Sequence, residues 1–227
     1  MTDKTAAKEP QQDNTEPKDP QAALRKKKIF TALALGIVFA LILALATFVD
    51  SNQKNNESVT ALPANSLVGW WGSFCPAHNT TVADADALNI RKKESQEDYL
   101  KRLSTALERQ ASDFRSAALT MRSSSVMMHG SDKQKEALQE LIDVLYEGDK
   151  LFSAKSNQVR ANPITTQQQM DKLSNVLRSV FEKYSATTQK VLSVIGQGDQ
   201  QTQDRIRKLS ECKQLFAELE EHNKAQK

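Results

Sequence analysis

Apolar residues after position 84 recur with the period of an α-helix. In the first stretch, apolar side chains lie seven residues apart with smaller ones between them: Leu100, Leu107, Phe114, Met121 and Met128, with Leu103, Ala111 and Ala118. This spacing places them on one face of a long helix, which must pack against other helices. Gly130 is a residue type that ends helices, and Ser131 with Gln134 matches a capping box. We therefore expect a turn here and a second helix after it.

The remainder of the chain repeats this pattern. The second helix should end before Asn162-Pro163, because the residue before a proline disfavours helical geometry. Thr166 and Gln169 predict the start of a third helix, Gly196 and Gly198 its end, and Asp199 the cap of a last helix. Their apolar faces comprise Leu138, Leu141, Leu145 and Phe152; Met170, Leu177, Tyr184 and Val191; and Ile206, Leu209, Cys212, Phe216 and Leu219.

Four helices joined by short turns predict one architecture for residues 84–227. It is an all-α, elongated antiparallel four-helix bundle with coiled-coil-like spacing. The first and third helices should each have about 35 residues and a length of roughly 50 Å. The seven-residue spacing also permits a homo-oligomer, in which a second copy of the chain completes the bundle.

A different pattern occurs near the N-terminus. Residues 29–49 form a run of 21 residues without a charged side chain, directly after the basic cluster Arg25 to Lys28. About 20 apolar residues are enough to cross a bilayer, so this run predicts a single transmembrane helix. A cleaved signal peptide ending at Ala46 is the alternative, but the apolar run is longer than such signals usually are.

The basic cluster also predicts the orientation of the chain. Positive residues favour the cytoplasmic side, which places residues 1–28 there as a short disordered tail. The C-terminal domain then lies outside the cytoplasm. For a bacterial inner membrane, which composition and size lead us to assume, that compartment is the periplasm. A eukaryotic type II membrane protein would have the same topology.

Residues 50–83 are expected to be a linker that contains an aromatic segment at 67–76. Trp70, Trp71 and Phe74 are concentrated there, with glycines that allow tight turns between them. Three roles remain open for these rings: packing across the bundle, binding a partner protein, or contact with the membrane surface. Trp70, Trp71 and Phe74 are therefore the candidate partner-binding residues.

The chain has two cysteines, Cys75 at the end of the aromatic segment and Cys212 on the apolar face of the last helix. Both fall in the compartment predicted to be oxidising, so a disulfide between them is the simplest interpretation. Such a bond would tie the aromatic segment to the bundle. Two buried, unpaired thiols are the alternative.

Charge and motifs argue against nucleic-acid binding, metal binding and catalysis. The net charge is +3, but residues 1–28 hold 7 Lys or Arg and 5 Asp or Glu, which leaves 24 and 23 in the rest of the chain. This nearly neutral part has no basic stripe for nucleic acid. The three histidines are far apart, with Cys75 and His78 as the nearest approach to a metal-ligand pair, and no nucleophile elbow or phosphate loop occurs. We expect no enzyme activity, no cofactor and no metal.

The leading hypothesis is a membrane-anchored, non-enzymatic helical protein that binds an extracytoplasmic or membrane protein, as an assembly subunit, tethered chaperone or inhibitor. The alternative is a sensory four-helix bundle for a small molecule, coupled through the membrane helix to a separate partner. In both, residues 29–49 contact the lipid bilayer.

Overall fold

The computed structural model describes residues 62–89, 91, 93–195 and 198–217. These residues form α-helices and two short 3₁₀-helices, and no strand occurs among them, which confirms the all-α class for this part of the chain. The α-helices are α2 (Ala64–Ala85), α3 (Gln96–Arg122), α4 (Ser125–His129), α5 (Asp132–Ala161), α6 (Gln167–Ile195) and α7 (Gln200–Arg207); the 3₁₀-helices are η1 (Asp86–Leu88) and η2 (Ser210–Cys212).

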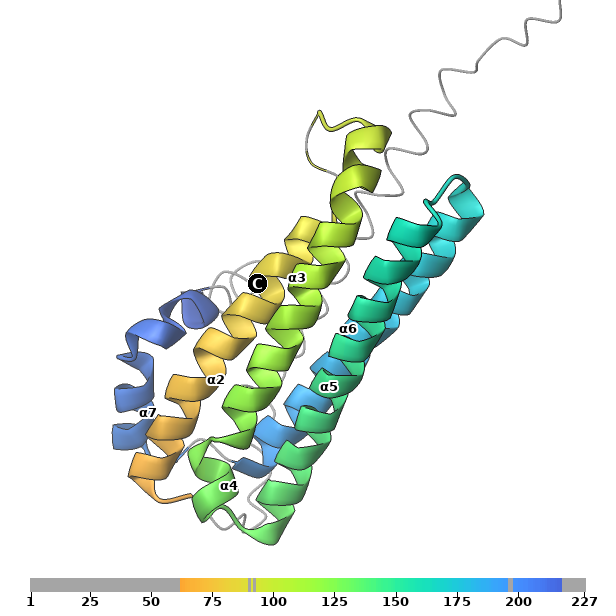
Figure 1. The fold of residues 1–227 in the computed structure, drawn as a ribbon. Helices are drawn as coiled ribbons and strands as arrows, with labels where there is room; N and C mark the ends of the chain where they lie inside the picture. Colours follow the sequence, from red (N-terminus) through yellow and green to blue (C-terminus); the bar gives the residue numbers. More distant parts are fainter. Residues whose placement is uncertain (1–61, 90, 92, 196–197, 218–227) are drawn as a thin grey trace, which may run out of the picture.

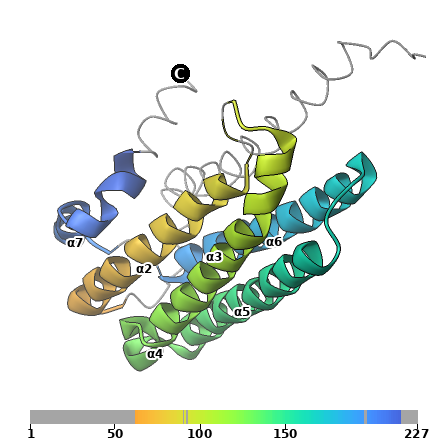
Figure 2. The ribbon, with the colours of Figure 1, turned by 45° about the horizontal axis from the view of Figure 1, so that its top comes forward.

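Four long helices, α2, α3, α5 and α6, lie side by side and alternate in direction (Figure 1). Helix α3 packs against both α2 and α5, and α5 also packs against α6. The short helix α7 lies against the outer side of α2, which Figure 2 shows from a second direction. The described residues therefore form an elongated helical array whose two ends carry different turns.

The fourth long helix is α2, and not the C-terminal helix that the sequence predicted. Residues 64–83 were expected to be part of a linker, but they form most of α2, whereas the predicted last helix is broken into α7 and η2. Gly69, Gly72 and Pro76 give this segment poor helix propensity. Burial overrides that propensity, because Leu67, Trp70, Trp71, Phe74 and His78 follow helical spacing and are all buried.

The first predicted helix is also shorter than expected. It was predicted to have about 35 residues and to run as far as His129-Gly130, but α3 has 27 residues, from Gln96 to Arg122, and the separate helix α4 follows it. At the start, Ser95 caps the helix by accepting a hydrogen bond from the Asp98 backbone N–H. At the end, the Ser123 hydroxyl donates to the carbonyls of Leu119 and Thr120, and such local bonds compete with helix continuation.

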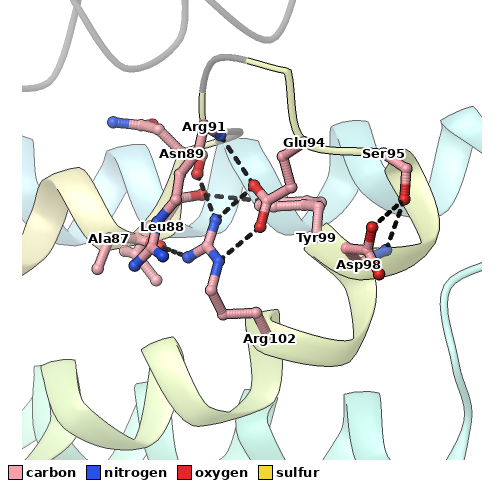
Figure 3. A network of polar contacts seen from close by, with 9 residues as sticks. All are labelled: Ala87, Leu88, Asn89, Arg91, Glu94, Ser95, Asp98, Tyr99 and Arg102. Carbon is pink, nitrogen blue, oxygen red and sulfur yellow. Dashed lines mark hydrogen bonds and ion pairs between the residues drawn. The ribbon is translucent and has the colours of Figure 1, made fainter.

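A polar network holds the connection between α2 and α3 (Figure 3). The Arg102 guanidinium donates to both carboxylate oxygens of Glu94 at 2.8 Å and to the carbonyls of Ala87 and Asn89. The Tyr99 hydroxyl donates to the Leu88 carbonyl at 2.9 Å. Because Arg102 holds the pKa of Glu94 down to about 2, this carboxylate stays ionised across the physiological range.

The predicted helix starts agree well with the structure. Ser131 and Gln134 form a reciprocal capping box at the start of α5. Thr166 and Gln169 make the same pair of bonds before α6, and the Asp199 side chain caps α7. Each cap satisfies backbone N–H groups that the first turn of a helix leaves without partners.

Predictions for the N-terminal part lie outside the described residues. These are the cytoplasmic tail at 1–28, the transmembrane helix at 29–49 and the first part of the linker. Among the helices within 62–217 that the structure describes, none is both long and apolar enough to cross a membrane.

Candidate partner-binding site

The predicted aromatic residues form a cluster in the core rather than on the surface. The rings of Trp70 and Phe74 stack with centroids 4.8 Å apart, and Trp71 packs edge-on against both. Trp70 and Phe74 are fully buried, and Trp71 is 8 % exposed. Of the three roles considered for these rings, the structure shows packing. Their use as partner-binding residues stays a prediction, and in this conformation they offer a partner almost no surface.

The disulfide between Cys75 and Cys212 is present, with the two Cα atoms 5.0 Å apart and both sulfurs buried. It joins the middle of α2 to η2. Around it, Trp71 contacts the Phe216 ring at 5.9 Å, and the Asn79 amide donates to the Glu211 carbonyl at 3.1 Å. The bond therefore holds the C-terminal segment over the outer side of the aromatic cluster.

His78 extends the aromatic cluster towards α6. Its ring stacks on Phe74, and its Nδ1 lies 2.9 Å from the Tyr184 hydroxyl oxygen. Complete burial lowers the pKa of His78 to about 4 and raises that of Tyr184, so both are neutral near pH 7. With Cys75 in a disulfide and His78 bonded to Tyr184, these two residues do not form a metal-ligand pair. No group of three or more metal-binding side chains occurs in the described part of the chain.

A second titratable pair lies between α2 and α3. Burial, together with the neighbouring carboxyl of Asp84, raises the pKa of Asp113 to about 7. One carboxyl oxygen of Asp113 is buried without a hydrogen-bond partner among the described residues. Like charges that share a partly dry site resist ionising together, so Asp113 holds a proton to a higher pH than an ordinary aspartate.

An open groove of about 480 Å³ lies between the end of α5 and the start of α6. Three buried side chains, Val159, Ile164 and Leu173, form its floor together with Val176. Its remaining lining is polar, with no carboxylate: Lys155, Gln158, Asn162, Gln169, Lys172 and Asn175. A concave surface with an apolar floor and a polar rim is typical of binding sites.

Sequence reasoning did not find this groove. Its residues come from α5, α6 and the connection between them, and most of the helical ones lie on the polar faces that helix periodicity assigns to solvent. No local signal in the sequence marks the groove, because only the pairing of α5 with α6 brings Lys155 and Lys172 to one site.

Comparison of the chain with protein-family models, with curated proteins and with solved structures finds no match. The fold and the groove therefore define the protein only by class: an all-helical domain with a buried disulfide and an open groove between two of its helices.

Proposed function

We propose that this protein is a non-enzymatic, membrane-anchored helical protein that binds another protein outside the cytoplasm. The observation that carries the proposal is the groove between α5 and α6, which combines apolar side chains in its floor with hydrogen-bonding side chains around them. Protein-binding surfaces have this arrangement of an apolar centre and a polar rim. In this proposal α2, α3, α5 and α6 act as an elongated, antiparallel four-helix ectodomain.

The disulfide supports a periplasmic location for the helical domain. Disulfides persist in oxidising environments such as the periplasm and are rare in the cytosol. The Cys75–Cys212 bond lies on the C-terminal side of the apolar run at 29–49, and the basic cluster lies on its N-terminal side. Both features fit one orientation, with the N-terminus in the cytoplasm and the helical domain in the periplasm, anchored in the cell inner membrane.

The groove lies at the end of the array opposite to the start of α2. Helix α2 begins at one end of the array, and the turn between α5 and α6, beside the groove, lies at the opposite end (Figure 1).

Capture of the partner from its own membranes tests this proposal. The tagged full-length protein is crosslinked in intact cells and purified, and a bait that carries only residues 1–61 with the same tag is the control. We expect one extracytoplasmic protein, or one extracytoplasmic domain of a membrane protein, at close to equal amounts with the full-length bait and absent from the control. Recovery of the same proteins with both baits would contradict binding by the helical domain.

The groove also favours a second candidate function, the sensory bundle for a small molecule. Its volume of about 480 Å³ lies in the range of small-molecule sites. This alternative predicts that a low-molecular-weight fraction of the periplasm raises the melting temperature of the full-length protein, and that crosslinking recovers no stoichiometric extracytoplasmic partner. The proposed function predicts the opposite result in both experiments.

A further inference from the structure

Two ion pairs join α5 to α6 along one side of the helix pair. Glu140 on α5 pairs with Lys190 on α6, and Glu147 pairs with Lys183. From the first pair to the second the chain advances seven residues on α5 and goes back seven on α6, as expected for antiparallel helices. Seven residues are nearly two helical turns, so both pairs lie on the same face.

The pairs Glu140–Lys190 and Glu147–Lys183 form a ladder of facing acidic and basic residues. The register of this ladder continues into the groove, where the acidic residue is missing. Eleven residues, about three turns, separate Glu147 from Gln158 on α5 and Lys172 from Lys183 on α6. The third position of the ladder therefore places Lys172 opposite a neutral glutamine, and both residues line the groove. Within the described part of the chain, neither Lys172 nor Lys155 takes part in an ion pair.

The neighbouring side chains fit a carboxylate at this point. Lys155 already reaches Gln158, donating to its amide oxygen at 3.0 Å. One lysine from each helix, Lys155 and Lys172, thus lines the groove together with Gln158. Asn162 and Asn175 add amide groups that donate and accept hydrogen bonds, and Val159 and Leu173 supply the apolar floor.

We propose that the groove binds an acidic segment of the partner protein, with a carboxylate of that segment between Lys155 and Lys172. This inference rests on the proposed function and specifies its partner. The bound carboxylate supplies the third acid of the ladder, and apolar side chains beside it pack on Val159 and Leu173. A segment of a protein, rather than a small anion, fits an open groove between two helices that offers charged, amide and apolar side chains together.

Photocrosslinking within the full-length protein, in its own membranes, tests the site. A benzoylphenylalanine replaces Asn175 in the groove, and a second protein carries it instead of Ala186. Ala186 is an exposed residue eleven positions further on the same face of α6. We expect crosslinking to a partner from position 175 and not from position 186, and mass spectrometry of the crosslinked peptide should identify a segment that contains Asp or Glu.

Three variants then test whether the crosslinking yield depends on the charges in the groove. Gln158→Glu supplies the missing acid from within the chain, so it should lower the crosslinking yield about tenfold without loss of thermal stability. Lys172→Glu should lower the yield at least as much. Glu147→Gln is the matched control: it opens a position of the ladder outside the groove and should leave the yield unchanged.

Several results would overturn the inference. Equal yields from positions 175 and 186, an unchanged yield in Gln158→Glu, or a crosslinked segment without carboxylates would each contradict it, as would crosslinks only to lipid or to a second copy of the chain. If the full-length bait still captures a stoichiometric partner that position 175 does not reach, the groove assignment fails while the proposed function stands. If neither experiment recovers a partner, the proposed function itself fails.

Discussion

Gly148 on α5 lies directly against the Phe114 ring of α3, and its replacement by alanine tests how tightly the core is packed. A Cβ atom at this position would lie 2.3 Å from Cδ1 and 2.6 Å from Cε1 of Phe114. Contacts this short require the ring to move. Phe114 is fully buried between the rings of Phe152 at 5.1 Å, Phe181 at 5.7 Å and Tyr184 at 5.8 Å, so it cannot move alone.

Two opposing contributions determine how much Gly148→Ala changes the free energy of unfolding. Alanine in place of glycine inside a helix stabilises it by roughly 0.5–1 kcal/mol. Overpacking of a dense core costs about 1–3 kcal/mol. We therefore expect Gly148→Ala to lower the free energy of unfolding by about 1–2 kcal/mol.

Gly72 provides a matched control, because it is also inside a helix but, apart from its chain neighbours and the nearby backbone of its own helix, nothing lies within 4 Å of the position its Cβ would take. Gly72→Ala should thus raise the free energy of unfolding by roughly 0.5–1 kcal/mol. The assay is urea unfolding of full-length protein in detergent micelles, followed by far-UV circular dichroism. Equal effects of the two variants would refute the packing argument.

A double variant isolates the contact itself. In Gly148→Ala with Phe114→Leu, the smaller side chain removes the clash, so the two changes together should destabilise less than the sum of their separate effects. A strictly additive result would show that the penalty at position 148 does not come from the Phe114 ring.

Four further predictions concern the disulfide, the titratable groups of His78 and Asp113, and the anchor. Cys212→Ser should lower the free energy of unfolding by about 2–5 kcal/mol and red-shift tryptophan emission, as Trp71 loses its cover; unchanged emission would contradict this arrangement. His78 is buried and neutral with a pKa near 4 against 6.5 when exposed, so it contributes up to about 3 kcal/mol above pH 6.5 that is lost as the pH falls towards 4. His78→Phe should flatten this part of the stability profile measured by urea unfolding. For Asp113 the pH dependence of stability has the opposite sign. Its raised pKa makes the free energy of unfolding fall as the pH rises from about 4 to 7, and Asp113→Asn should remove that slope. Finally, the mature protein should stay in the membrane after carbonate extraction, whereas a soluble product beginning at Thr47 would show that the apolar run is cleaved.

The long α5 and α6 helices and the turns beside them were predictable from the sequence, because the signals are local. The capping residues Ser131, Thr166 and Asp199 act within three positions of their own helix. The disulfide was predictable for another reason: the chain has two cysteines, so only one intramolecular pairing exists.

Helix α2 shows where local signals fail. Gly69, Gly72 and Pro76 argue against a helix, while the aromatic residues between them follow helical spacing. The two signals conflict, and burial of Trp70 and Phe74 against the other helices decides between them. Such burial depends on elements distant in the sequence, so propensity alone does not determine it.

The sequence by itself determined that α3, α5 and α6 are amphipathic helices, where several helices begin, and which two cysteines could pair. Only the tertiary structure decided that α2 is the fourth long helix, that the tryptophans lie inside the core, and that Lys172 faces a glutamine in a groove. Periodicity identifies the buried face of a helix, but not the helix that covers it. The pairing and register of α5 with α6 give that information, because they bring together residues far apart in the chain.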